Sequence, residues 1–367
     1  MGSGRSEVEG MVRADPGFYA GKKVLVTGHT GFKGSWLCRI LKLLGAEVYG
    51  YSLEPPTDPS LYEIAGIGGQ VYSKIADIRD YAALSRFYAD ASPDIVMHLA
   101  AQPIVREGYR IPRETYESNV MGTVNILECV RTHLCARSFL NVTTDKVYDN
   151  NDADRYYSEG DRLDGYDPYS NSKSCSELVT HSYRRSFLEQ AGVAVSTARA
   201  GNVIGGGDFA KDRLVPDCVR AAVAGKDVVL RNPNSVRPYQ HVLEPLYSYL
   251  TVAAAQYADP KLAGSYNIGP DREDCITTGE LAGEFCSMWG KGLKWRAEDD
   301  NGPHEASFLK LDNSLLRKVF GISPLWHSSD AVARTVEWTR VWADGGDVLA
   351  CMDSQIREYF LGRGINL

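Results

Sequence analysis

The chain of 367 residues lacks any long apolar run. No stretch approaches the roughly 18 or more apolar residues that a membrane helix needs, so we expect a protein that does not span a membrane. The chain also lacks an excess of basic residues, because 40 Lys+Arg stand against 47 Asp+Glu for a net charge of −7. This balance argues against nucleic acid or an anionic membrane surface as the main partner, since both attract cationic proteins.

The eight cysteines form no CxxC pair and show no spacing typical of a zinc site. Several fall in apolar helical stretches, where a free cysteine behaves as a small hydrophobe. We therefore expect reduced structural thiols, no bound metal and a cytoplasmic location rather than a disulfide framework. Residues 1–20 carry no apolar signal segment, and we interpret them as a flexible leader.

From Gly21 onward, short β-branched runs alternate with longer amphipathic stretches. The expected strands cover 23–27, 47–51, 70–75, 95–99, 138–142 and 195–200, and the clearest helices cover 31–44, 114–134 and 169–190. This alternation is typical of the α/β class with a doubly wound parallel sheet, the Rossmann arrangement. After Ala200 the pattern becomes glycine-rich and irregular. We predict a Rossmann domain from 21–200 plus about 239–262, and a smaller α+β substrate lobe from about 201–238 plus 263–367.

A glycine-rich segment follows the first predicted strand. Thr27-Gly-His-Thr-Gly-Phe-Lys-Gly34 places glycines at 28, 31 and 34, where the next helix begins. Such glycines let the backbone approach a pyrophosphate, whose charge the N–H groups at the helix start bind. A plain tight turn is the alternative, but the position between a strand and a helix favours a dinucleotide site.

The end of the second predicted strand bears on the choice of cofactor. NAD sites often carry an acidic residue there for the ribose, but this strand ends Tyr51-Ser52-Leu53-Glu54, with the acid late. Ser52 can bond the ribose instead, while Lys33 can favour the 2′-phosphate of NADP. We expect NAD, with NADP as the alternative. Asp77 and Ile78, after the third strand, are placed to meet the adenine ring, although Asp77 or Asp80 can equally cap a helix.

Tyr169 and Lys173 are four residues apart at the start of a predicted helix, which puts the phenol and the ammonium on one face. A tyrosine acting as a base near neutral pH needs its pKa lowered by roughly three units, about 4 kcal/mol. A nearby lysine and a cationic nicotinamide would supply much of this. Tyr-x-x-x-Lys alone usually marks a surface pair, but downstream of a dinucleotide loop it indicates a hydride-transfer site.

Thr144, Asp145 and Lys146 follow the fifth predicted strand. Doubly wound sheets bind ligands at the carboxyl ends of their strands, so these side chains are candidates for the mouth of the site. A threonine hydroxyl there can bond a substrate oxygen, and the other two groups can exchange protons. A helix cap with a solvated ion pair is the plainer interpretation.

These motifs together resemble the extended short-chain dehydrogenase/reductase family, from Gly21 nearly to the C-terminus. More narrowly, the chain resembles the CDP-D-glucose 4,6-dehydratases. The resemblance rests on these segments: 27–36, Thr144-Asp-Lys146, Gly165-Tyr-Asp-Pro-Tyr-Ser170, Arg199-Ala-Gly-Asn-Val-Ile-Gly-Gly-Gly-Asp208, 237–245 and His304-Glu-Ala306. The related dTDP-glucose dehydratases have Asp-Glu where this chain has Asp145-Lys146. Val147 and Tyr239 depart from the expected Cys and Trp.

The resemblance implies roles for individual residues. The implied catalytic residues are Thr144, Asp145, Lys146, Tyr169 and Lys173. The implied cofactor residues are Gly28, Thr30, Gly31, Phe32, Lys33, Gly34, Ser52, Asp77, Ile78, Leu99, Ala100, Ala101, Asn119, Tyr169 and Lys173. Asn119 would order the helix that flanks the site. The implied substrate residues are Gln102, Asn202, Arg213, Arg237, His241 and His304. Arginine suits a diphosphate because its forked guanidinium matches phosphate oxygens. A surface salt bridge is the competing interpretation for Arg213, and a satisfied polar contact for His241 and His304.

The implied reaction is the NAD-dependent dehydration of a nucleotide-activated hexose, CDP-D-glucose foremost, to a 4-keto-6-deoxy sugar for deoxysugar and lipopolysaccharide O-antigen synthesis. The alternatives are a nucleotide-sugar 4-epimerase, a dehydratase of another nucleotide hexose and, more remotely, a non-catalytic nucleotide-sugar-binding protein. The resemblance also implies a homodimer, or a higher oligomer, in which helices 114–134 and 169–190 pair with their copies.

Overall fold

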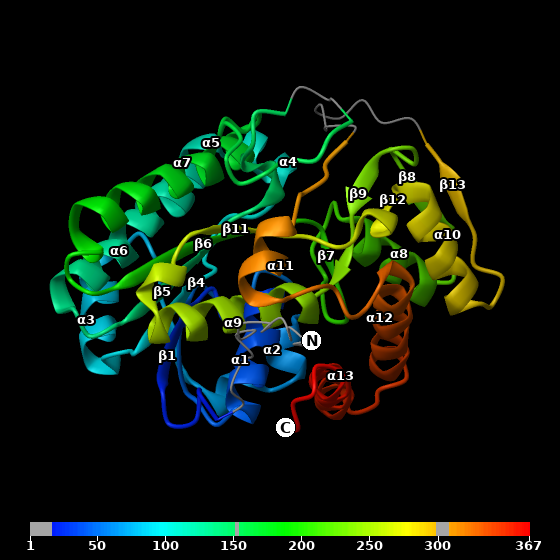
Figure 1. Cartoon of the computed structure of the whole chain (residues 1–367). Coiled ribbons are helices and arrows are strands. Elements are labelled where there is room, and N and C mark those ends of the chain that lie inside the picture. Colours follow the sequence, from blue (N-terminus) through cyan, green and yellow to red (C-terminus); the bar gives the residue numbers. More distant parts are fainter. Residues whose placement is uncertain (1–16, 151–153, 299–307) are drawn as a thin grey trace, which may run out of the picture.

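The computed structural model describes residues 17–150, 154–298 and 308–367 (Figure 1). At its centre is a seven-stranded sheet, entirely parallel, with strand order β11-β6-β5-β4-β1-β2-β3. The strands are β1 (Lys23–Thr27), β2 (Glu47–Ser52), β3 (Tyr72–Ile75), β4 (Ile95–His98), β5 (Ser138–Val142), β6 (Ala194–Ala200) and β11 (Ser265–Ile268). The strand order reverses between β1 and β4, where doubly wound sheets bind their ligands. The predicted fold class is confirmed.

Helices cover both faces of this sheet, because successive side chains of a strand point to opposite sides. Val24 and Val26 of β1 face a core shared with α1 (Phe32–Leu43) and α9 (Leu243–Ala258). Leu25 faces the other core, with α3 (Tyr81–Ala91) and α6 (Gly122–His133). Helix α7 (Pro168–Tyr183) packs beside α6 (Figure 1).

The smaller lobe has a core of its own, enclosed by α8 (Leu214–Val223), α10 (Thr278–Trp289) and α12 (Ser328–Ala343). Its strands form three small pairs: β7 (Val203–Ile204) with β10 (Gln240–His241), β9 (Val236–Pro238) with β12 (Cys275–Thr277), and β8 (Val228–Leu230) with β13 (Trp295–Ala297). The remaining helices are α2 (Leu61–Ile64), α4 (Val105–Arg110), α5 (Pro112–Tyr116), α11 (Ser314–Phe320) and α13 (Val348–Gly362).

The structure moves two predicted boundaries. Tyr19 belongs to the expected leader, yet its ring is buried and its hydroxyl donates to the Leu250 carbonyl at 2.7 Å. The leader prediction is therefore wrong at its end, while its residues 1–16 lie outside the described part of the chain. Strand β11 begins at Ser265, beyond the predicted boundary at 262, and completes the large sheet.

The two long predicted helices are each interrupted by a π-helical turn. These turns span Glu117–Met121, between α5 and α6, and Arg184–Leu188, after α7. A π turn inserts an extra residue into the helix and is frequent at functional sites. The first of them carries Asn119, which is buried.

None of the helices in the described residues is long and apolar enough to cross a membrane. Within the same residues, no group of three or more His, Cys, Asp or Glu side chains is arranged to hold a metal ion. All eight cysteines are free thiols.

Candidate active site

The loop between β1 and α1 forms an open cradle of backbone. Gly28 has a φ of +77°, and a Cβ there would lie 2.8 Å from the Ala100 nitrogen. A Cβ on Gly34 would lie 2.1 Å from the Gly28 oxygen, so α1 packs directly on the loop. At Gly31 a Cβ would meet only the Gly28 oxygen, at 3.4 Å. No side chain caps α1 and its first turn holds no acid, so the cradle fits the pyrophosphate of a dinucleotide.

The floor of this cradle joins the carboxyl ends of β1 and β4. Thr27 Oγ1 accepts hydrogen bonds from the Leu99 and Ala100 backbone nitrogens at 3.1 and 3.2 Å. It also lies 2.7 Å from Nδ1 of His98. Ala101 continues this half-buried segment. The predicted residues 99–101 therefore lie at the point where the strand order reverses.

The predicted adenosine end is built from short polar side chains. Ser52 Oγ lies 2.9 Å from Thr30 Oγ1, and Thr30 donates to the Leu53 carbonyl at 2.9 Å. Asp77 accepts two bonds from the Arg79 side chain at 2.9 and 2.6 Å, which lowers its pKa. Asp80, and not Asp77, caps the helix that follows.

Two further predicted cofactor residues, Ile78 and Lys33, lie in different parts of the structure. Ile78 is buried against Gly122 on α6, where a Cβ would lie 2.7 Å from its Cγ2. Lys33 lines the central cavity, and burial together with the charges of Arg213 and Lys173 lowers its pKa to about 7. The side chain of Lys33 thus lies near Arg213 and Lys173 at the cavity, and its role at a 2′-phosphate stays a prediction.

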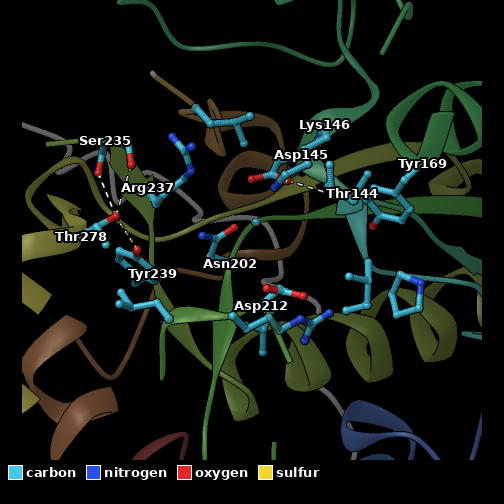
Figure 2. A pocket seen from close by; sticks show the side chains of 18 of the residues that line it. Thr144, Asp145, Lys146, Tyr169, Asn202, Asp212, Ser235, Arg237, Tyr239 and Thr278 are labelled. Atoms are coloured by element: carbon cyan, nitrogen blue, oxygen red, sulfur yellow. Dashed lines mark hydrogen bonds and ion pairs between the residues drawn. The ribbon is translucent and has the colours of Figure 1, made fainter. Parts of the chain in front are cut away.

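A cavity of about 360 Å³ lies over the carboxyl ends of β5 and β6 and reaches into the smaller lobe (Figure 2). Predicted residues in its wall are Lys33, Thr144, Asp145, Lys146, Tyr169, Asn202, Arg213 and Arg237. Segments far apart in the sequence thus meet at one site. This volume lies within the range of small-molecule sites.

Asp145 occupies the centre of this wall. Its Oδ1 accepts the Thr144 hydroxyl at 2.9 Å and lies 3.4 Å from the Lys146 ammonium. Its Oδ2 is buried and has no hydrogen-bond partner within the described residues. Gly201 lies next to this oxygen, and a Cβ there would lie 3.2 Å from it. An orphaned buried oxygen costs free energy unless a ligand satisfies it.

Tyr169 lies in the first turn of α7, next to Thr144. The Asp167 carboxylate caps this helix by accepting the Tyr169 and Ser170 backbone nitrogens at 2.9 and 3.0 Å. Burial raises the pKa of Tyr169 to about 12, although Thr144 and Arg213 act to lower it. The predicted lowering by Lys173 is not found in the chain alone, because burial outweighs the neighbouring groups.

Lys173 is buried one turn after Tyr169. Its Nζ donates to the Val142 carbonyl at 3.1 Å. Burial lowers the pKa of Lys173 to about 8, and the charge of Glu177 opposes this change. The lysine is thus fixed at the carboxyl end of β5 and titrates near physiological pH.

The family model for the NAD dependent epimerase/dehydratase family matches residues 24–269, more than half of the chain. The chain belongs to this family. It is 46% identical to the CDP-glucose 4,6-dehydratase of Salmonella typhimurium, over 94% of this chain and 98% of that protein. It is 26% identical to the dTDP-glucose 4,6-dehydratase of Shigella flexneri, over 86% and 92%.

Solved structures agree with this assignment at the level of the fold. The dTDP-glucose 4,6-dehydratase of Bacillus anthracis, solved with NAD, superposes with a TM-score of 0.72 at 21% identity, over 89% of this chain and 99% of that one. The UDP-glucuronic acid 4-epimerase of Bacillus cereus gives 0.75 at 22% identity, over 87% and 99%. Both reactions therefore occur on this fold, and the side chains must decide between them.

Two predicted arginines of this family member line the cavity in different settings. Arg237 is buried, and its guanidinium donates to the Val236 carbonyl at 3.0 Å. Arg213 forms an ion pair with Asp208 at 3.1 Å, and both also line the cavity. The salt-bridge interpretation of Arg213 and its place in the site are therefore compatible. Asn202 lies between Arg237 and Asp145 in the cavity (Figure 2).

Gln102 and Asn119 form hydrogen bonds with each other and do not line the cavity. Asn119 Oδ1 accepts the Gln102 nitrogen at 2.8 Å, and its amide donates to the Gln102 carbonyl at 3.0 Å and to Ser172 at 2.9 Å. The Gln102 side chain donates to Thr115 at 3.0 Å and accepts from the Ile104 nitrogen at 2.6 Å. Each end of this amide makes a hydrogen bond within the chain, and the substrate contact of Gln102 stays a prediction.

Of the two predicted histidines, only His241 belongs to the described residues, and it does not line the cavity. His241 is fully buried with its ring edge-on to Trp326 and Trp36, at centroid distances of 5.0 and 6.0 Å. Burial lowers its pKa to about 3, so it is a neutral core residue and the predicted substrate contact is wrong. His304 lies outside the described residues.

Several wall residues were not assigned to the site from the sequence, although Tyr239 was noted there as a departure from the family pattern. Tyr239, Ser235 and Thr278 form a hydroxyl cluster beside Arg237, in which Thr278 Oγ1 lies 3.2 and 3.3 Å from the other two hydroxyls (Figure 2). No local sequence motif contains this cluster, because Thr278 comes from α10 and the others from around β9. Asp167 could have been found, since an acid before a proline is a typical helix start.

Proposed function

We propose that this protein is an NAD-dependent dehydratase that converts CDP-D-glucose to CDP-4-keto-6-deoxy-D-glucose. Asp145 carries the proposal, because it presents a buried, unpartnered carboxylate oxygen in the same cavity as Tyr169. A 4-epimerase needs the tyrosine and the lysine but no acid to expel water. The 46% identity to the Salmonella protein supports CDP-glucose as the substrate.

The first step is oxidation at C4 of the hexose. Tyr169 accepts the O4 proton, and Thr144, which acts to lower its pKa, bonds the same region of the substrate. When bound, NAD would supply the acceptor for the C4 hydride and the source of the hydride for C6. The Lys173 ammonium, directed by the Val142 carbonyl, favours the phenolate electrostatically.

The second step is loss of water across C5 and C6. The new C4 ketone acidifies the C5 hydrogen, and the C6 hydroxyl leaves with a proton from Asp145. Lys146, 3.4 Å from Asp145, accepts the C5 proton; in the alternative, Lys146 stabilises the enolate and the C5 proton passes to solvent. The sugar loses one water in total, and no external reductant is consumed because the hydride taken from C4 ends at C6.

NAD, rather than NADP, is the cofactor in this proposal. The two cations that could serve a 2′-phosphate are engaged elsewhere, Lys33 at the cavity and Arg79 with Asp77 and Glu117. Ser52 remains at the adenosine end as a neutral partner for the ribose.

Incubation with CDP-, dTDP-, UDP- and GDP-glucose tests the proposed function. We expect a 4-keto-6-deoxy sugar, detected by its absorbance in alkali, from CDP-glucose at a rate well above the others. A C4 epimer as the sole product would replace the proposal with an epimerase, and a product from another nucleotide alone would change the substrate. Binding without turnover would make the protein a sensor.

Arg237→Ala should raise KM for the nucleotide sugar by about 30- to 1,000-fold, because a phosphate would lose a buried charged partner worth about 2–4 kcal/mol. NAD affinity should not change, since Arg237 belongs to β9 and not to the cradle. Arg296→Ala, at an exposed arginine of the same lobe, is the control. An equal loss of NAD affinity would assign Arg237 to the cofactor or the fold.

A homodimer through α6 and α7 is the second part of the proposal. Met121, Leu178 and Phe187 are about half exposed along this pair of helices, and a partner subunit on these helices would remove these large apolar side chains from water. We expect Leu178→Glu to convert a dimer to a monomer in sedimentation equilibrium. Leu361→Glu, at a more exposed leucine on α13, should leave the dimer intact. A monomeric wild type would contradict this assembly.

A further inference from the structure

A buried ion pair lies directly behind the proposed catalytic residues. Glu177 on α7 and Arg199 on β6 are 0% and 1% exposed. The Arg199 Nε and Nη2 donate to the two Glu177 oxygens at 3.0 and 2.9 Å, a bidentate pair. Removing two charges from water costs several kcal/mol per ion, and that cost is recovered only with excellent geometry and further hydrogen bonds.

The further bonds of this pair reach the ends of two strands. Thr143 donates to Glu177 at 2.6 Å and Thr197 at 2.8 Å, so both carboxylate oxygens are doubly satisfied. Arg199 donates its remaining nitrogen to the Tyr148 hydroxyl at 2.9 Å. Thr143 and Tyr148 both line the cavity, and Thr143 immediately precedes Thr144. The pair therefore connects α7 with the segment that carries the catalytic threonine and aspartate.

Glu177 also follows Lys173 by one helical turn, on the same side of α7. It is the charged group that counteracts the effect of burial on the Lys173 pKa. The other charged or titratable groups around Lys173 either disfavour its ammonium form or do not stabilise it. These are Lys33 on α1, the neutral His98 on β4, the protonated Tyr169 on α7, Arg199 behind Glu177, and Asp145, which Lys146 and Thr144 already engage.

We propose that Glu177 is a positioning residue that holds α7 against the ends of β5 and β6 and keeps the buried Lys173 ammonium charged and aimed at the cofactor. This inference rests on the proposed function only in assigning Lys173 to the cofactor. It predicts that replacing the carboxylate changes the pH range in which the cofactor binds, and not merely the stability of the fold.

The test is equilibrium binding of NADH, followed by its fluorescence between about pH 6 and 9, with no sugar present. In the wild type, affinity should fall as the pH rises through the Lys173 pKa of about 8. Below that pH the lysine is charged, and above it the charge is lost. Glu177→Gln should move this midpoint about one pH unit lower, because the remaining neighbours disfavour the ammonium.

Glu244→Gln is the matched control. Glu244 forms another buried pair, with Arg363 at 2.8 Å, that ties α9 to the C-terminal segment away from the cavity. Both variants should lower Tm, but only Glu177→Gln should move the midpoint. Equal losses of Tm with an unchanged midpoint would reduce Glu177 to a purely structural residue and overturn the proposal.

Glu177→Asp keeps the charge and tests the proposal even where Glu177→Gln does not fold. Its shorter side chain loses contact with Thr143 or Thr197, so NADH affinity should drop several-fold while the midpoint stays near that of the wild type. A midpoint as low as that of Glu177→Gln would contradict the electrostatic role. Because no sugar is used, a wild type that fails to turn over CDP-glucose would disprove the proposed function and leave this result standing.

Discussion

Tyr169→Phe should slow C4 oxidation by about a thousandfold or more. The substitution keeps the buried ring and the backbone of Tyr169, against which Gly108 of α4 packs, and removes only the oxygen that accepts the O4 proton. General acid–base groups contribute about 10²–10⁴ to a rate, and a buried site offers no bulk water as a substitute base. The measurement is the absorbance of reduced nicotinamide in a single turnover with CDP-glucose.

Tyr109→Phe is the control, because Tyr109 is a partly exposed phenol on the nearby α4. It should oxidise C4 at the wild-type rate. Near-normal oxidation by Tyr169→Phe would remove Tyr169 from the mechanism and leave another group to accept the proton.

The same step should depend on pH in a defined direction. Burial raises the pKa of Tyr169 to about 12, so the rate of C4 oxidation should rise with pH as more phenolate forms. The rise should end as Lys173, with a pKa of about 8, loses the charge that favours this phenolate. Lys173→Ala should weaken cofactor binding and remove the end of the rise near pH 8, whereas a flat profile in the wild type would contradict the roles of both groups.

The sheet was predictable because its signals are local. The centre of a buried strand such as Lys23–Thr27 is the apolar run Val-Leu-Val, and the glycines at 28 and 34 are required by a turn that leaves no room for a Cβ. The segment Ser265–Ile268 was not assigned to the sheet, because its partner β6 lies about 70 residues earlier and no local pattern records that pairing.

Side-chain direction could not be predicted in the same way. Lys33 belongs to the cofactor loop by sequence, yet the first turn of α1 points it into the cavity. His241 lies within a family motif, but two tryptophans from α1 and the segment before α12 enclose it. By its sequence position, Glu177 is one more polar residue of an amphipathic helix, and only the fold places Arg199 beside it. In each case distant segments decide the role.

Asp145→Asn should separate the two chemical steps. The amide has nearly the shape of the carboxylate and can still contact Thr144, so the wall of the cavity is preserved. It cannot deliver a proton to the C6 hydroxyl, which is a poor leaving group. We expect C4 oxidation to continue and the reduced cofactor to accumulate, while loss of the C6 hydroxyl slows by about 10²–10⁴.

Single-turnover absorbance measures C4 oxidation, and mass analysis of the sugar measures loss of the C6 hydroxyl. Asp149→Asn, a half-exposed aspartate four residues along the same loop, should behave as wild type. Wild type in deuterated water should place one deuterium at C5 of the product, because the proton lost there is replaced from solvent when the hydride returns to C6. An epimerase would leave C5 unlabelled. If Asp145→Asn gives the 6-deoxy product at the normal rate, another group must protonate the leaving hydroxyl, and the unpartnered oxygen of Asp145 would no longer distinguish a dehydratase from an epimerase.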